Sequence, residues 1–146
     1  MNTENRNWTE EQKRYLDNCY RLFKYERLAW KIQGIVLLVM SLIWFALGTL
    51  FFLFAIGDLY VAAPLGVIFV LYGIVFLPLA IIALVMVRKA EHYMEITYTD
   101  IEAVRVRCNS VGMIVFSVLF GAISPIFIII NFCCAKVNAR IFDEMV

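Results

Sequence analysis

The only histidine of the chain, His92, lies between two carboxylates, Glu91 and Glu95. Imidazole and carboxylate side chains are common metal ligands, and they also carry protons near neutral pH. A metal site needs three or four converging ligands, and this segment supplies no others. We therefore interpret the group as a solvated charged face, and we expect no metal ion, no cofactor and no catalytic residue.

Motifs that carry catalysis are absent from the sequence. The chain contains no glycine-rich phosphate loop, no HExxH, no Cys-x-x-Cys and no Gly-x-Ser-x-Gly. Its long apolar stretches also lack the intramembrane Asp, Glu, Lys or Arg residues that mark proton relays and ion pathways. We predict a non-enzymatic protein without a small-molecule substrate, and the net charge of +1 argues against a nucleic-acid partner.

A line of polar side chains follows one face of the last apolar stretch. Its members are Ser110, Ser117, Ser124 and Asn131, each seven residues after the one before. One hypothesis is that they form hydrogen bonds across a helix interface, each worth about 0.6 kcal/mol on average. The other is that several copies turn this face inward and line a narrow, uncharged pore. Isoleucines flank the line and would keep such a pore poorly wetted, so we favour packing.

Small residues recur at the same spacing in the two earlier apolar stretches. The positions are Gly34, Ser41, Gly48 and Ala55 in the first stretch and Gly66, Gly73 and Ala80 in the second. A seven-residue repeat keeps one helix face against a partner. In lipid, small residues allow two helix backbones to approach closely. We predict that these positions are helix-packing seams, within one chain or between copies.

The four cysteines are the remaining residues with reactive side chains. Cys19 and Cys108 fall in segments that we expect to face a reducing compartment, so we predict free thiols. Cys133 and Cys134 end the last apolar stretch, where lipidation of a cytoplasmic juxtamembrane cysteine is one reading. We favour the other reading, in which they are small apolar packing residues.

The composition identifies the environment that must hold these residues. Hydrophobic residues make up 63% of the chain and charged residues 17%, whereas a soluble domain has roughly 45–50% and about 25%. From residue 32 to residue 87 the only charge is Asp58, and residues 109–135 carry none. A water-soluble domain is thereby excluded.

These stretches predict an all-α integral membrane protein with three transmembrane helices. About 20 apolar residues cross a bilayer core of ~30 Å, which gives spans at residues 34–56, 64–87 and 111–135, with a tight turn at residues 57–60. The third stretch has a rival interpretation as a re-entrant segment broken between Gly121 and Pro125. We favour a full span, because each arm would be only ~18 Å long and irregular backbone is not tolerated in lipid.

The distribution of Lys and Arg predicts the orientation. Eleven of the thirteen cations precede the first span or lie in residues 88–110, and the turn at Asp58 has none. The positive-inside rule then places the N-terminus in the cytoplasm of a multi-pass protein of the cell membrane. Lys136 and Arg140, in the short tail at residues 136–146, would lie outside as a modest violation.

The polar segments are expected to be helices at the membrane surface. Residues 1–33 predict a cytoplasmic amphipathic helix that starts with a Thr9–Gln12 capping box. Its apolar face has Leu16, Tyr20, Phe23 and Trp30, interrupted by Arg27. We expect this helix to anchor at the membrane surface, where its basic face suits anionic lipid, or to pack on the chain's own loop; docking to a soluble partner is the alternative. Residues 88–110 predict a loop with a strand-like alternation from residue 94, then a short helix capped by Thr99.

The leading hypothesis from these features is a membrane protein that acts by helix association. It would be a homo-oligomer or a small subunit of a larger membrane complex, with the lipid bilayer and other membrane subunits as its partners. The alternative is a pore-forming or membrane-perturbing homo-oligomeric effector lined by the third span. A third reading, an enzyme that uses the loop from Glu91 to Asp100, is distant.

Overall fold

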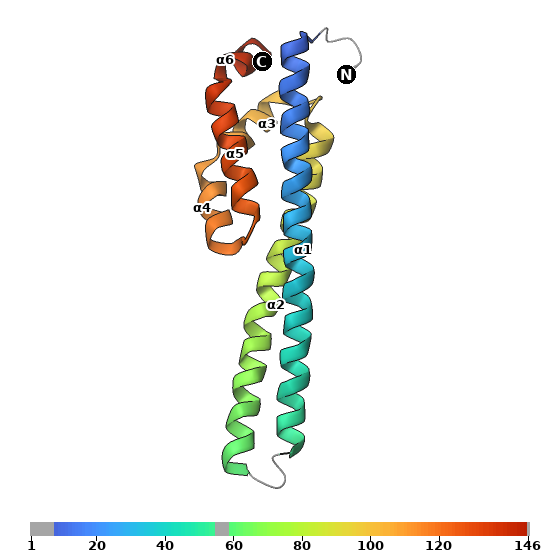
Figure 1. The fold of residues 1–146 in the computed structure, drawn as a ribbon, viewed down its shortest axis with the longest axis vertical. Coiled ribbons are helices and arrows are strands. Elements are labelled where there is room, and N and C mark those ends of the chain that lie inside the picture. The colour runs from blue at the N-terminus through green and yellow to red at the C-terminus, as the bar shows by residue number, and fades with distance from the viewer. Residues whose placement is uncertain (1–7, 55–58, 146) are drawn as a thin grey trace. The chain divides into compact units, whose positions relative to one another are not determined.

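A computed structural model describes residues 8–54 and 59–145, and the side chains of residues 59–62 lie outside the description. Every regular element in this part of the chain is a helix, which agrees with the predicted all-α class (Figure 1). The helices are α1 (Glu10–Phe54), α2 (Leu59–Ile96), α3 (Ile101–Cys108), α4 (Val111–Phe120), α5 (Ser124–Val137) and α6 (Ala139–Met145).

The chain divides into two compact units. The paired-helix unit is Lys31–Leu84, and it contains the later part of α1 and the first part of α2. The terminal unit is Met1–Trp30 together with Val85–Val146, and it contains the start of α1, the end of α2 and the four shorter helices.

Two of the described helices, α1 and α2, are long and apolar enough to cross a membrane. The number rises to four if each of two bent pairs, α3 with α4 and α5 with α6, is counted as one span. The chain therefore has the length and composition of a transmembrane protein.

Helix α1 begins where the sequence predicts. The Thr9 N–H donates to Gln12 Oε1 at 3.0 Å, and the Gln12 N–H donates to Thr9 Oγ1 at 3.2 Å, which is the reciprocal capping box. Glu10 and Glu11 follow in the first turn, where negative charge favours the helix start. The helix then continues without interruption to Phe54, so residues 10–33 are the first part of α1 and not a separate element.

The expectation of a loop with strand-like alternation after residue 88 is wrong, because α2 continues to Ile96. No proline or glycine follows Pro78 in this helix, so nothing breaks it. Its end is marked by Thr97, whose hydroxyl donates to the Tyr93 carbonyl at 2.5 Å. The short helix α3 does follow, although its cap is Asp100, which accepts from the Ala103 N–H at 3.0 Å, and not Thr99. Of the turn expected at residues 57–60, residues 57 and 58 lie outside the described part, and α2 begins at Leu59.

The expectation of one uninterrupted helix over residues 111–135 is also wrong. Helix α4 ends at Phe120, α5 begins at Ser124, and the two lie side by side as a hairpin (Figure 1). Pro125 explains the break, because its ring clashes with the carbonyl four residues earlier in a continuous helix, and it is well tolerated in a first turn. Gly121, with no side chain, ends α4 in an extended conformation.

Within the terminal unit, ring contacts and one ion pair show which residues of the later helices pack against the start of α1. Before the hairpin tip, Arg107 pairs with Glu26 and Phe116 contacts Trp30, at 6.5 Å between ring centroids. After the tip, Phe127 stacks on Tyr25 at 5.7 Å, and Phe142 meets Tyr15 edge-on at 5.0 Å. The hairpin therefore runs along α1 and returns, which brings α6 beside the first turns of α1.

The core of the terminal unit is formed by buried residues of α1, α3, α5 and α6, and partly buried residues at the end of α2 pack against it. Its buried members are Tyr15, Leu16, Cys19, Phe23, Ile101, Val104, Cys108, Ala135, Phe142 and Met145. The apolar face predicted for the first helical segment is thus covered by the chain's own later helices. Leu16, Phe23 and Trp30 are fully buried there, while Tyr20 and Arg27 are half-buried.

Candidate functional site

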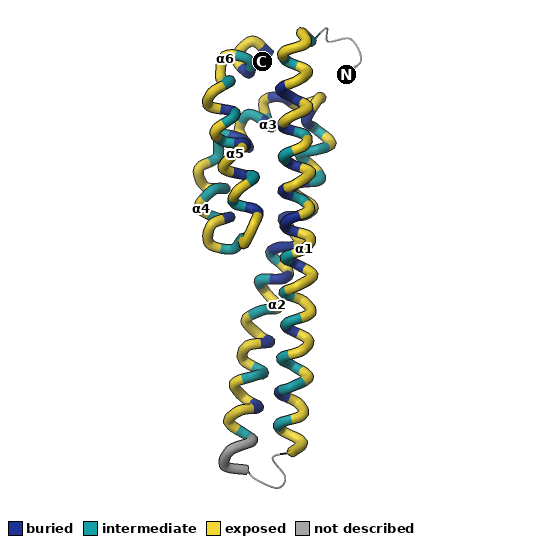
Figure 2. Tube along the Cα trace, in the orientation of Figure 1, coloured by how far each residue is buried: buried dark blue, intermediate teal, exposed yellow. Residues whose placement is uncertain are grey.

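The structure places the small residues of the first two apolar stretches inside the paired-helix unit. Six of them are described and all six are buried: Gly34, Ser41, Gly48, Gly66, Gly73 and Ala80. The seventh, Ala55, lies outside the described residues. Buried positions recur along the facing sides of α1 and α2, while most other positions are exposed (Figure 2).

The two helices approach each other through their backbones at a pair of glycines. A Cβ atom on Gly48 would lie 3.1 Å from the Gly66 carbonyl oxygen and 2.6 Å from Val70 Cγ2. A Cβ atom on Gly66 would lie 3.2 Å from the Gly48 carbonyl oxygen. Because these are contacts with backbone as well as side chain, neither position has room for a larger residue.

One hydrogen bond joins the same two helices. The Ser41 hydroxyl donates to the Gly73 carbonyl oxygen at 2.9 Å, across a buried contact. Gly73 is also covered by the Phe45 ring, which would lie 3.1 Å from a Cβ atom there. The small residues of α1 and α2 therefore contact each other's helix within one chain.

The polar line on the third apolar stretch is also turned into the chain. Ser117 and Ser124 are fully buried and Asn131 is 3% exposed, while Ser110 is half-buried and caps α4 by accepting from the Met113 N–H. Ser117 donates to the Ile114 carbonyl at 2.8 Å. Asn131 Oδ1 accepts from the Cys108 thiol at 3.4 Å.

A buried ion pair is the main feature of the terminal unit that the sequence did not single out. Arg107 Nη2 donates to Glu26 Oε1 at 2.5 Å, and their side chains are 5% and 2% exposed. The Arg107 guanidinium also lies over the Tyr93 ring at 5.5 Å from its centroid. The pair joins α1 to α3, and Tyr93 adds the end of α2.

Burial raises the pKa of the Glu26 carboxyl above its usual value, and the Arg107 charge and the Trp30 indole N–H oppose this rise. Trp30 Nε1 makes no hydrogen bond of good geometry, so its effect is that of a nearby dipole. Tyr15, in the core of the terminal unit, also has a raised pKa because of burial, and its hydroxyl is unpartnered. These groups are held in a buried, packed environment.

One sequence signal could have found Glu26. Leu16, Cys19, Phe23 and Trp30 follow the alternating three- and four-residue spacing of a buried helix face, and Glu26 occupies the missing step. Arg27, which was expected to interrupt the apolar helix face, is only partly buried and pairs with Glu91 at 2.7 Å. No comparable local signal marks Arg107.

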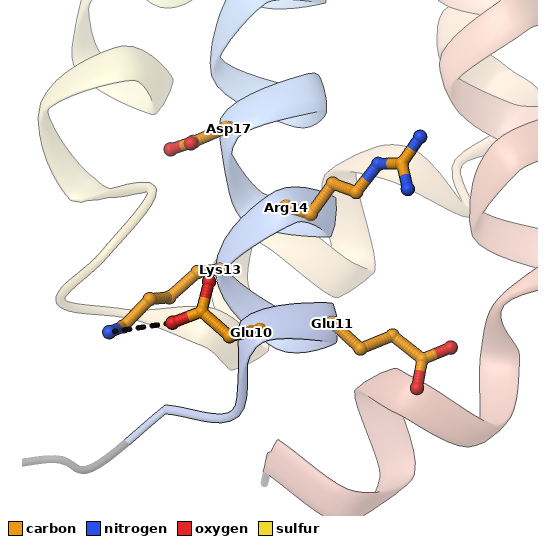
Figure 3. Close-up of a pocket in the computed structure, with 5 residues that line it drawn as sticks. All are labelled: Glu10, Glu11, Lys13, Arg14 and Asp17. Carbon is orange, nitrogen blue, oxygen red and sulfur yellow. Dashed lines mark ion pairs between the residues drawn. The ribbon is translucent and has the colours of Figure 1, made fainter.

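The residues with catalytic or metal-binding potential are not gathered into a site. His92 is exposed and touches the Tyr93 ring at 5.7 Å, and no cluster of metal ligands occurs in the described part of the chain. A hollow of about 670 Å³ is lined by five charged residues of the first turns of α1, among which only Lys13 and Glu10 are joined, at 3.7 Å (Figure 3). In Figure 3 the Asp17 and Glu11 side chains extend to different sides of the helix, so these groups do not converge on one point.

The cysteines are all free thiols. Cys19 and Cys108 are buried in the core of the terminal unit, Cys133 is exposed and Cys134 is half-buried.

The fold and these sites define a class of protein: an all-helical chain with two long apolar helices that contact each other at small residues. Its terminal unit contains a buried ion pair. Comparison with protein-family models, curated proteins and solved structures finds no match to the chain.

Proposed function

We propose that the protein is a non-enzymatic membrane protein that acts by helix association, as a homo-oligomer or as a small subunit of a larger membrane complex. The observation that carries this proposal is an apolar hollow of about 260 Å³ on the surface of α2. It is lined by Ile68, Leu71, Tyr72 and Val75, which are three and four residues apart and so share one helix face.

The position of this hollow supports a second helix as its occupant. All four lining residues are exposed, whereas the seam with α1 is formed by Gly66 and Gly73 on another face of α2. The hollow is thus available after the two helices of the unit have packed. Tyr72 gives it one hydroxyl, which suits a polar contact with a partner helix in lipid.

The burial of Ser117, Ser124 and Asn131 within the chain supports packing as the role of this polar line. A pore lined by the same residues would need them at a surface between copies. We therefore rank the pore-forming alternative below helix association.

We further propose a place in the cell membrane with both chain ends on the cytoplasmic side. The Tyr15–Phe142 contact supports this, because helices that touch near their outer ends lie on one side of a bilayer. The number of crossings is then even. All thirteen Lys and Arg residues would lie inside, which removes the violation that a three-span topology creates at Lys136 and Arg140.

The test of association is the mass of the protein after extraction from its own membrane and after purification. We expect a mass larger than one chain in the first case, and a loss of that mass in Leu71→Trp, which fills the hollow. Ile43→Trp, at an exposed position of α1, is the matched control. A single-chain mass in both preparations would overturn the proposal, and ion conductance in liposomes would favour the pore instead. Reporters fused to each end and inserted at Asp58 test the topology separately.

A further inference from the structure

We infer that the α4–α5 hairpin inserts into the acyl chains of one leaflet without crossing the bilayer. This leaflet is the one on the side where the N- and C-termini of the protein lie. The inference rests on the proposed membrane topology. The outer surface of the hairpin is its first support: Val115, Val118, Leu119, Ile123, Ile126 and Ile130 are all exposed, and no charge occurs from residue 109 to residue 135. An apolar surface of this continuity is not stable in water.

The direction of the hairpin supports lipid as the occupant. Going along α1 from Glu26 to Trp30, the partners change from Arg107 to Phe116, so α4 runs in the same direction as α1. That direction leads away from the charged residues Glu10, Lys13 and Arg14 in the first turns of α1. The hairpin tip is therefore directed away from the charged start of this helix.

The length of the hairpin limits its depth. At ~1.5 Å per residue, α4 with 10 residues is about 15 Å long and α5 with 14 residues about 21 Å, both shorter than a hydrocarbon core of ~30 Å. The end of α4, Phe120, lies only about 6 Å beyond the level of Phe116 and its partner Trp30. A depth of that size is typical of elements held in the interfacial layer, at roughly 5–10 Å.

Charges at the base of the hairpin match the headgroup layer. Arg105 precedes α4, and Lys136 and Arg140 follow α5, whereas the tip has no charge. Lys136 Nζ lies 5.6 Å from the centroid of the Phe132 ring, an aromatic and cationic pair suited to the interface. The hairpin therefore begins and ends close to charged residues on the same side, and its uncharged tip lies at the other end.

The backbone at the tip explains how it tolerates lipid. The Gly121 N–H donates to the Ser117 carbonyl at 2.7 Å, and the Ile126 N–H donates to the Ile123 carbonyl at 3.2 Å. Pro125 has no N–H to satisfy. These features reduce the unpaired donors that otherwise exclude a turn from the hydrocarbon region.

Fluorescence quenching by lipid-bound nitroxides in phosphatidylcholine and phosphatidylglycerol vesicles tests the depth. The full chain carries Cys133→Ala and Cys134→Ala, which remove the two less buried thiols. A fluorophore is attached at an added cysteine, Ile123→Cys. The double alanine variant without Ile123→Cys measures how much label reaches the buried thiols Cys19 and Cys108. Nitroxides near the headgroup should cause the larger loss of fluorescence at Ile123→Cys. Leu42→Cys, exposed within the first expected span, should be quenched most by nitroxides near the ends of the lipid acyl chains, at the bilayer centre. Val106→Cys, exposed on α3, should be quenched by a water-soluble quencher.

Three results would overturn the inference. Quenching at Ile123→Cys that resembles Leu42→Cys would mean that the segment reaches the bilayer centre. Quenching that resembles Val106→Cys would mean an aqueous face for a soluble partner. Disulfide cross-linking of Ile123→Cys between copies, without lipid quenching, would mean that a second copy covers the hairpin. Leu119→Cys, 70% exposed, repeats the measurement if the first variant does not fold. None of these outcomes alters the mass test, so failure here is distinct from failure of the proposed association.

Discussion

The helices within each of the two units of this chain are held together by a different kind of contact. In the paired-helix unit, small residues lie at buried facing positions and allow backbone contact at Gly48 and Gly66, and aromatic rings such as Trp44 and Phe69 also stack between the helices. In the terminal unit the facing positions include a buried ion pair, Glu26 with Arg107, and a thiol–amide contact, Cys108 with Asn131. In the paired-helix unit, Ser41 makes a polar contact between helices, with the Gly73 carbonyl oxygen.

The difference follows from what drives helices together in each setting. Two helices in lipid gain nothing by burying apolar bulk, so close van der Waals contact and occasional hydrogen bonds must hold them. A packed unit with aromatic and aliphatic residues gains by removing them from water, and this gain can offset the desolvation of one charge pair. The pair adds little net stability compared with apolar residues of the same volume, and it joins α3 to α1 at Arg107 and Glu26.

The largest effect is expected from Glu26→Ala, which leaves the Arg107 charge buried without a partner. The expected loss is about 3–5 kcal/mol of unfolding free energy, measured by denaturant unfolding in detergent micelles. Glu10→Ala, which removes an exposed ion pair, should cause no measurable change. Glu26→Leu combined with Arg107→Met should recover most of the loss. If Glu26→Ala unfolds like the parent, the ion pair does not hold the terminal unit together.

A smaller effect is expected from Gly48→Leu in the paired-helix unit. The new side chain would meet Val70 and the Gly66 backbone, and overpacking of this kind costs about 1–3 kcal/mol. Insertion should be unchanged because leucine favours the bilayer, so protease protection separates packing from insertion. Ala46→Leu on the exposed side of α1 is the matched control. Equal behaviour of the two variants would show that α1 and α2 do not meet at Gly48.

Asn131→Leu should weaken the terminal unit by about 0.6–1 kcal/mol, the size of an interhelical polar contact. The reason is loss of the contact with the Cys108 thiol. Unfolding and liposome conductance are measured together, with the exposed neighbour Ile130→Leu as the control. Conductance in the parent that disappears in Asn131→Leu, at unchanged oligomer mass, would reverse our ranking of packing above a pore.

The smallest effect is expected from Tyr98→Phe. Tyr98 donates to Asp17 Oδ1 at 2.6 Å at an exposed site, so the loss should be about 0.5 kcal/mol. Partial burial and Asp17 raise the pKa of Tyr98 from 10.0 to about 12. The bond therefore contributes fully below pH 10.0, and its contribution is lost as pH rises through about 12. The stability difference between parent and Tyr98→Phe should vanish over this range, whereas Tyr25→Phe should show no such convergence.

The sequence alone determined the features that depend on local order. The capping box at Thr9 and Gln12, the all-helical class and the long apolar helices follow from neighbouring residues, and the structure has all three. The seven-residue spacing likewise places small residues on one face by helix geometry alone. The same local logic failed at residues 94–99, where a short alternation of apolar and polar residues was taken for a strand although α2 continued.

Tertiary structure decided what depends on distant partners. The arrangement of the two helices on either side of Pro125 depends on packing, since α5 returns along α1 and contacts it through Phe127 and Tyr25. Arg107 looks like an ordinary surface cation in sequence, and its partner Glu26 is 81 residues away. A charge is stable when buried only if its counter-charge arrives with it, and no pattern within either helix carries that information.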